Sequence, residues 1–174
     1  MKREVFFMEH IDWASINKLI QEIQKMRDSG DEAITLFVGS PGGKNTPSIG
    51  FYDWIKAEKI NLTTVAIGQT SSAALYIFLS GTKRKALAHS MFMVHPGGRV
   101  GDGIRRWLMR IASPRRYRED KEFDLTIDRA GQDIYIKETK LSPTMVERLL
   151  TREHLVMIPE QALKKGFISE IVQP

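Results

Sequence analysis

Extended and helical patterns alternate through the first hundred residues of this chain, and this alternation limits the folds open to it. Short apolar runs at residues 4–8, 34–38 and 63–67 are typical of buried strands. Between the first two, residues 13–29 repeat apolar side chains at the three- and four-residue spacing of a helix with one buried face. Strands separated by helices favour βαβ units and a mostly parallel sheet. We therefore expect an α/β fold.

Local signals mark the ends of the expected helices. Asp12 is expected to cap the first helix, and Gly30 to end it. Thr46 and Pro47 predict the start of the second, with threonine as the cap and proline in the first helical position. The other expected elements are a buried helix near 74–79, a polar turn into a short strand over 83–87, a strand at 91–94, helices that begin at the prolines 114, 143 and 159, and a last strand at 167–172.

Size and composition indicate an ordinary globular protein. The 174 residues suit one domain over residues 1–174, with 42% hydrophobic and 27% charged residues and no internal repeat or linker. The sequence has no cysteine, so disulfides and thiolate metal sites are excluded and a reducing cytoplasm is the expected location. No apolar run is long enough for a signal peptide or a membrane span. We expect no metal and no cofactor.

Positive charge is concentrated in one segment. Residues 99–118 hold seven arginines and one acid, Asp102, a local charge of +6 against +5 for the whole chain. The remainder therefore carries −1, so the basicity is a local stripe. A solvated face or a subunit contact is the favoured interpretation, and binding to nucleic acid or another acidic partner is the alternative.

Three candidate site segments follow strands. The pair Gly42 and Gly43, then Ser72, then His95 each come just after an apolar run. Ligand sites in parallel sheets lie beyond the carboxyl ends of the strands. We therefore expect the three segments to converge at one edge of the sheet.

These residues have the chemistry of acyl transfer. Ser72 can serve as a nucleophile and His95 as the base that takes its proton. Backbone N–H groups in the glycine pair and at Ala73, the residue after the serine, can meet an oxyanion. Taken singly, each motif also has a plainer interpretation. A serine at a strand–helix turn is commonly a turn or cap residue, and a histidine before Pro-Gly-Gly can be a hydrogen-bonded turn residue.

The motifs together resemble those of a known family. Residues 40–43 (SPGG), 68–73 (GQTSSA) and 93–96 (MVHP) look like the three motifs of the Clp protease proteolytic subunit, in the same order and at similar spacing. Residues 160–171 (EQALKKGFISEI) are similar to the family's terminal helix, glycine and strand. The likeness covers nearly the whole chain.

The resemblance implies a fold and an activity. The fold would be the ClpP/crotonase-like spiral of ββα units, with a projecting oligomerisation helix at about 114–140 that contacts another subunit through Phe123, Ile127 and Ile134. The activity would be that of an ATP-dependent serine endopeptidase with Ser72 as nucleophile and His95 as base. The N–H groups of Gly43 and Ala73 would form the oxyanion hole. Heptameric rings stacked face to face would enclose a chamber that receives unfolded chains from an AAA+ unfoldase.

The chain departs from the family pattern in three places. Alignment from Glu160 backward puts His154 where the family has its orienting aspartate, with Glu153 one residue earlier as the substitute acid. The spacing from Ser72 to His95 is a little shorter than the family leads one to expect. The sequence also starts almost at its first strand, so the family's N-terminal segment that meets the unfoldase is expected to be missing.

Three other functions stay open on the sequence alone. A Clp-like ring subunit with a decayed site would keep the fold and act as a structural or interaction protein. A crotonase-type acyl-CoA enzyme would share the fold and the oxyanion hole without needing Ser72 next to His95. A nucleic-acid-binding module would use the arginine stripe, with binding that falls steeply with salt.

Overall fold

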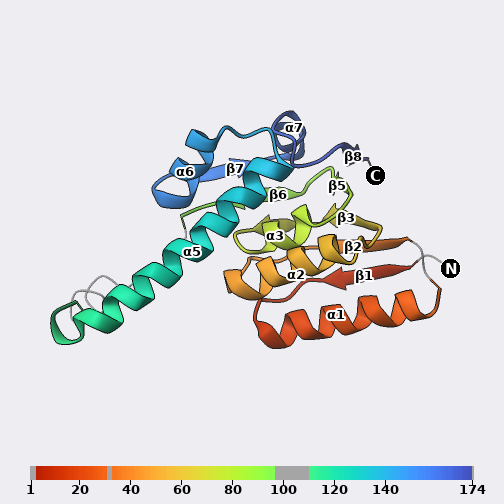
Figure 1. The fold of residues 1–174 in the computed structure, drawn as a ribbon. Coiled ribbons are helices and arrows are strands. Elements are labelled where there is room, and N and C mark those ends of the chain that lie inside the picture. The colour runs from red at the N-terminus through yellow and green to blue at the C-terminus, as the bar shows by residue number, and fades with distance from the viewer. Residues whose placement is uncertain (1–2, 31–32, 97–109, 174) are drawn as a thin grey trace.

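The computed structural model describes residues 3–30, 33–96 and 110–173. Its main sheet has five strands in the order β1-β2-β3-β5-β8, and every neighbouring pair is parallel (Figure 1). The predicted α/β class with a parallel sheet is confirmed. The strands are β1 (Glu4–Phe7), β2 (Ile34–Val38), β3 (Leu62–Ala66), β5 (Lys83–Leu87) and β8 (Glu170–Val172).

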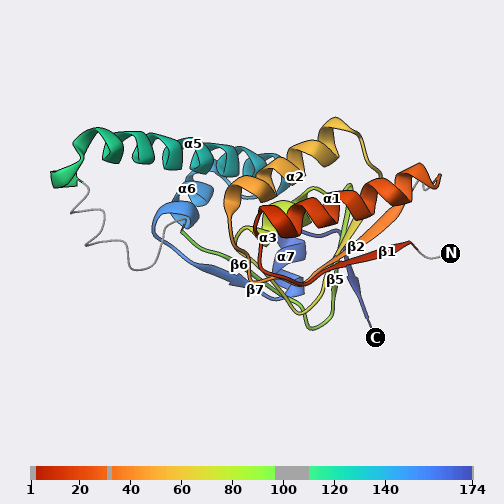
Figure 2. The same ribbon diagram turned by 90° about the horizontal axis from the view of Figure 1, so that it is seen from below.

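Two amphipathic helices cover one face of this sheet (Figure 2). In α1 (Trp13–Asp28) the Asp12 carboxylate accepts the Ser15 N–H at 2.8 Å, and Gly30 takes φ +85° just after the helix, as predicted. The predicted start of α2 is wrong, because the helix spans Asn45–Ala57 and its N-cap is Lys44. The N–H of Lys44 is bound by the Ile11 carbonyl at 2.9 Å, so a tertiary contact fixes this helix end instead of the Thr46 hydroxyl.

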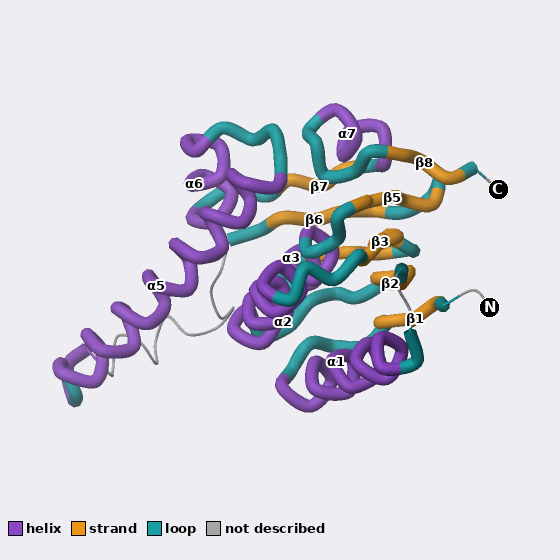
Figure 3. The backbone as a smooth tube through the Cα atoms, turned by 45° about the vertical axis from the view of Figure 1, so that its right-hand side comes forward, coloured by secondary structure: helices purple, strands orange, loops and turns teal. Residues whose placement is uncertain are grey.

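A second, smaller sheet lies beside the first. It contains β4 (Gln69–Ser71), β6 (Met91–Val94) and β7 (Leu155–Met157), with β4 parallel and β7 antiparallel to β6. Figure 3 shows β6 and β7 side by side. The sequence predicted a tight turn at 68–74 and no strand at 155–157. Both β4 and β7 have only three residues, too few to show a period of their own. Immediately after β4, α3 (Ala74–Leu79) is buried along its whole length.

The helix α5 (Pro114–Glu138) projects from the body, as Figures 1 and 2 both show. Its described side chains from Pro114 to Thr126 are exposed, and Phe123 keeps 58% of its surface. The other end is buried, with Tyr135 packed between Tyr76 and Phe167. Ile134 lies in the core of its own chain, so its predicted contact with another subunit is wrong.

An ion network anchors the buried end of α5. The Glu138 carboxylate is paired with Arg84 Nη1 at 2.7 Å and Lys56 Nζ at 3.0 Å, and it accepts the Tyr52 hydroxyl at 2.7 Å. Burial by itself raises the pKa of Glu138, but the Tyr52 hydroxyl and the two cations outweigh it and lower the pKa overall. Burial and the same contact with Glu138 raise the pKa of Tyr52. We call these four residues the α5 anchor.

Arg84 also binds three backbone carbonyls, from two segments of the chain. Its Nε donates to the Phe167 carbonyl at 2.8 Å, and its Nη2 donates to the carbonyls of Glu138 at 2.7 Å and Gly166 at 3.2 Å. The helices α6 (Pro143–Thr151) and α7 (Pro159–Lys164) complete the C-terminal region, and both begin at the predicted prolines. The Ser142 hydroxyl caps α6 by accepting the Met145 N–H at 3.3 Å.

Candidate active site

Ser72 occupies a sharp bend between β4 and α3. Its φ is +57°, and the only other described non-glycine residue with positive φ is Lys59. This left-handed conformation costs an L-residue about 1–2 kcal/mol, and such strain clusters at functional sites. The bend is held by the Ser72 N–H, which donates to the Met93 carbonyl at 2.8 Å.

The bend also distinguishes Ser72 from its neighbour Ser71. Ser71 is fully buried, and its hydroxyl accepts a hydrogen bond from Gln69 Nε2 at 3.0 Å. Ser72 is half-buried, and its hydroxyl makes no hydrogen bond to a described residue. Of the two serines, Ser72 is therefore the one available to a substrate.

The predicted glycine loop packs directly against this serine. A Cβ at Gly42 would lie 2.7 Å from Ser72 Cβ, and a Cβ at Gly43 would lie only 2.2 Å from the Ile11 carbonyl oxygen. Neither position has room for a side chain, and their φ values of +103° and +153° also favour glycine. Ser40 braces the loop, because its hydroxyl donates to the Glu9 carbonyl at 2.6 Å and accepts the Gly42 N–H at 3.1 Å.

Two backbone N–H groups near Ser72 have no hydrogen-bond acceptor among the described residues. The loop pairs with Ile11 through the Gly42 carbonyl and the Lys44 N–H, and the Gly43 N–H takes no part in this pairing. The Ala73 N–H, at the start of α3, is likewise bound to no described group. Such unpaired N–H groups on neighbouring segments can hold a negatively charged oxygen.

His95 follows β6, the strand that pairs with β4. The register sets Ser71 beside Met93, so Ser72 and His95 leave the ends of adjacent strands. No hydrogen bond joins the Ser72 hydroxyl to the His95 ring. The ring is half-buried, and its Nδ1 lies 2.9 Å from the Pro96 carbonyl oxygen. A proton on Nδ1 would leave the Nε2 lone pair free to act as a base.

The strand β7 brings to this site the segment that was expected to hold the orienting acid, Glu153 and His154. Its antiparallel register pairs Val94 with Leu155, so the next residues, His95 and His154, lie across from each other. Their ring centroids are 6.0 Å apart and their planes differ by 15°. The sequence pointed to position 154 but gave no sign of this ring pair, which depends on β7.

Glu153, the substitute acid, is engaged elsewhere. Its Oε1 pairs with Arg148 Nε at 3.4 Å, and it shares no hydrogen bond with His95. The pair is a weak one, because both side chains are about half exposed. The structure therefore brings Glu153 to the same strand end as His95 while its carboxylate contacts α6.

The predicted arginine stripe lies partly outside the described residues, and its described arginines take no part in this site. Residues 97–109, which include Arg99, Arg105, Arg106 and Asp102, are not among those described. The rest of the arginine stripe, at 110, 115, 116 and 118, is exposed. Within the described ranges no three His, Asp or Glu side chains are grouped as metal ligands, and no helix is long and apolar enough to cross a membrane.

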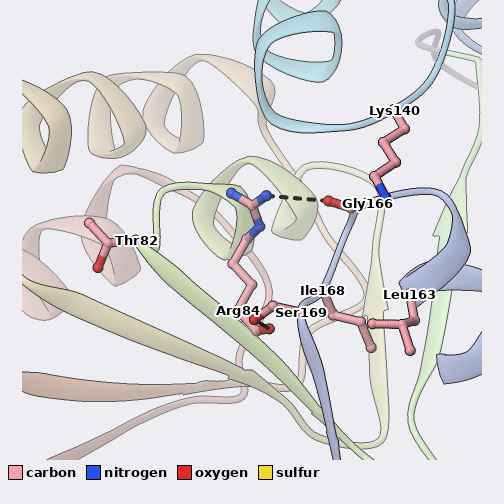
Figure 4. Close-up of a pocket in the computed structure, with 7 residues that line it drawn as sticks. All are labelled: Thr82, Arg84, Lys140, Leu163, Gly166, Ile168 and Ser169. Atoms are coloured by element: carbon pink, nitrogen blue, oxygen red, sulfur yellow. Dashed lines mark hydrogen bonds between the residues drawn. The ribbon is translucent and has the colours of Figure 1, made fainter.

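A separate pocket of about 400 Å³ lies beside the α5 anchor, and Figure 4 shows its lining. None of the candidate site residues lines it. Arg84 reaches it, but the Arg84 donors are already bound to Glu138 and to backbone carbonyls. The lining residues are Thr82, Arg84, Lys140, Leu163, Gly166, Ile168 and Ser169.

A strained serine beside a glycine loop and a histidine at the end of the adjacent strand are residue types that a serine hydrolase requires. Comparison with known proteins gives the family: the sequence model of the Clp protease family matches residues 1–174. This chain therefore belongs to the Clp protease family, a family of serine peptidases that generally form oligomeric rings. The expected family resemblance is confirmed.

The individual proteins that are similar to this chain are also Clp protease subunits. The chain is 30% identical to ATP-dependent Clp protease proteolytic subunit 4 of Rhodococcus jostii, over 89% of this chain and 80% of that protein. It is 27% identical to the ATP-dependent Clp protease proteolytic subunit of Mesostigma viride, over 98% of this chain and 72% of that protein. A subunit 1 from Thermobifida fusca is 34% identical over 54% of this chain and 44% of its own length. These identities describe a divergent member of the family.

Proposed function

We propose that this protein is a serine endopeptidase of the Clp type that hydrolyses unfolded polypeptides or peptides inside an oligomeric chamber. The observation that carries this proposal is the bend at Ser72. A serine with φ +57° lies in contact distance of a glycine that admits no side chain, at the end of the strand beside His95. Strain of this kind is maintained where a nucleophile must be presented to a substrate.

In the proposed mechanism, Ser72 Oγ attacks the peptide carbonyl carbon. His95 Nε2 takes the hydroxyl proton and later gives it to the leaving amine. The N–H groups of Gly43 and Ala73 donate to the oxygen that becomes negative in the tetrahedral intermediate. Their lack of a described partner supports this role, because they need not break another bond when the oxyanion forms. Water then hydrolyses the acyl-enzyme by the same steps.

Glu153 is the proposed orienting acid. An acid at His95 Nδ1 would hold the ring and stabilise the imidazolium that forms during attack. To act in this way, Glu153 has to leave Arg148 and replace the Pro96 carbonyl at Nδ1. Because the Glu153–Arg148 ion pair is exposed and has a single contact, breaking it costs little free energy.

The family and the exposed part of α5 both support assembly of this chain into an oligomer. The exposed part of this helix carries Phe123 and Leu125, apolar side chains suited to contact with a second copy of the chain. We propose a cytoplasmic homo-oligomer of stacked rings, heptameric as in the family, to which an AAA+ unfoldase brings ATP dependence. Phe123→Ser should lower the sedimentation coefficient of the assembly. A wild-type protein that stays monomeric at micromolar concentration would contradict this proposal.

The activity is tested by a serine-reactive fluorophosphonate. The wild-type protein should be labelled and should hydrolyse peptides, whereas Ser72→Ala should lose labelling and lower hydrolysis by about 10³-fold or more. Ser71→Ala is the matched control, because it removes the neighbouring buried hydroxyl and should keep labelling. Equal labelling of wild type and Ser72→Ala would exclude Ser72 as the nucleophile.

A ring subunit without activity is the second candidate. The observation that favours it is the Glu153 carboxylate, which contacts Arg148 and not His95. On this alternative, the protein assembles but neither reacts with the fluorophosphonate nor hydrolyses peptides.

A further inference from the structure

Two imidazole rings face each other at the end of β6 and β7. His95 and His154 continue the antiparallel register of these strands, with ring centroids 6.0 Å apart. His154 is exposed and forms no hydrogen bond or ion pair with a described residue. A second imidazole beside the proposed base has no place in the mechanism above, so its function needs a separate explanation.

The separation of the rings suits two ligands of one metal ion. Imidazole binds zinc at about 2.0–2.1 Å, which puts a ring centre about 3.2 Å from the ion. Two rings on one ion then have centres between about 5.2 Å at a tetrahedral angle and about 6.4 Å when opposed. The observed 6.0 Å lies inside this range. The planes of the two rings differ by only 15°, so the exposed His154 ring has to turn about χ1 and χ2 before both lone pairs point at one ion.

The environment of His95 has a second feature of metal-binding histidines. Such a residue usually donates its other ring N–H to a carboxylate or a backbone carbonyl, which fixes the tautomer and the ring orientation. The Pro96 carbonyl oxygen lies 2.9 Å from Nδ1 and can accept this N–H. The Nε2 lone pair then takes no part in this hydrogen bond and is available to a metal ion.

We propose that His95 and His154 together bind a divalent transition-metal ion, with zinc as its representative, and that the bound ion blocks peptide hydrolysis. The inhibitory part rests on the proposed function, because it takes His95 Nε2 as the general base. One lone pair cannot both hold the ion and accept the Ser72 proton. His154 is then a regulatory ligand beside the base.

The binding should be reversible and selective. With no third protein ligand grouped at this place among the described residues, water completes the coordination and the ion can exchange. Two imidazoles favour zinc, nickel or copper, whereas magnesium prefers oxygen ligands. The Arg148 cation that pairs with Glu153 adds no attraction for a metal ion, which also favours an exchangeable site.

Calorimetric titration of the full-length Ser72→Ala protein with zinc chloride tests the site without any activity. We expect one zinc ion per chain and at least a tenfold loss of affinity when His154→Ala is added. His89→Ala is the matched control, because His89 is also exposed but lies in the turn before β6, and it should leave zinc affinity unchanged. Magnesium should give no binding heat. Zinc affinity that is equal with and without His154 would overturn the proposal.

A parallel activity assay separates this inference from the proposed function. Zinc should inhibit wild-type hydrolysis, a chelator should restore it, and His154→Ala should need at least tenfold more zinc for half-inhibition of its own activity. Hydrolysis without zinc binding that depends on His154 would refute the metal site and leave the peptidase intact. Such zinc binding in a protein that hydrolyses nothing and resists the fluorophosphonate would support the metal site and refute the peptidase.

Discussion

Two carboxylates of this protein have opposite environments, one in the α5 anchor and one beside His95. We call the strand ends that carry His95, Glu153 and His154 the rim of the candidate active site. In the anchor, Glu138 has 11% of its side chain exposed and is held by Arg84, Lys56 and Tyr52. At the rim, Glu153 has 42% exposed and one ionic partner at 3.4 Å. The first arrangement fixes an element in place, since a buried charge must keep its partners. The second leaves the carboxylate free to move, since an exposed pair contributes little energy.

This difference separates two kinds of variant. Changes at the anchor should lower the stability of the fold, whereas changes at the rim should lower activity and leave stability almost unaltered.

The largest effect is expected from Arg84→Met. It removes the closest cation from Glu138 and leaves the carbonyls of Phe167 and Gly166 without their donor. Breaking a buried pair on one side should lower the free energy of unfolding by about 3 kcal/mol or more, measured by urea denaturation. Arg115→Met, which breaks an exposed pair with Glu119, should change it by less than about 0.5 kcal/mol. Equal effects of the two variants would refute the role of the anchor.

At the rim, Glu153→Gln should lower peptide hydrolysis by about 10²-fold or more while the urea midpoint stays unchanged. The lost carboxylate can no longer orient His95 or stabilise its imidazolium. His154→Ala should lower hydrolysis less. Glu160→Gln, a nearby exposed acid on α7, serves as the control with full activity. Full activity of Glu153→Gln would instead assign the orientation of His95 to the Pro96 carbonyl.

Acid should destabilise the wild-type protein partly through Glu138. Because its folded pKa is lowered from the ordinary 4.5, its stabilising contribution is complete above that value and is lost as pH falls through the folded pKa. In Glu138→Gln, stability should therefore fall less steeply below pH 4.5, by at most about 1.4 kcal/mol per pH unit. Urea denaturation at a series of pH values measures the slope, and an unchanged slope would contradict the prediction.

The smallest effect concerns the bend itself. Ser72→Gly and Ser72→Ala both remove the hydroxyl, but only glycine relieves the strain of φ +57°. The glycine variant should be more stable than the alanine variant by about 1 kcal/mol, measured by urea denaturation. An alanine variant of equal or greater stability would mean that position 72 has no strain to relieve.

Much of the fold could be read from local sequence signals. The cap at Asp12, the strand at 34–38 and the proline-led helices α5, α6 and α7 all lie where composition and periodicity predict them. The start of α2 was misplaced, because Lys44 is fixed by the distant Ile11 carbonyl and not by a neighbouring side chain. The strands β4 and β7 were missed because three residues carry no periodicity, and their pairing is decided by β6.

The site could be predicted in its parts but not in its contacts. Gly43, Ser72 and His95 were expected at one edge of a single sheet. The structure brings their segments together from two sheets, because Gly43 follows β2 while Ser72 and His95 follow β4 and β6. The stacking of His154 on His95 could not be predicted, because it follows from the register of an unpredicted strand. The α5 anchor was also missed, since Arg84 and Glu138 are 54 residues apart and look like ordinary surface charges in the sequence.

Because α5 is held firmly at only one end, a small tilt of this helix at the anchor becomes a large displacement at its other end. Its 25 residues give a length of about 37 Å, and the fixed point is at Glu138, the last residue. A tilt of about 5° at the anchor therefore moves the far tip by about 3 Å, roughly the width of an atomic contact. In the proposed assembly, the position of Phe123 relative to another subunit would thus depend on Arg84, which lies at the opposite end of the helix. In that assembly, a small change in β5 would alter how copies of the chain meet while every contacting side chain stays the same.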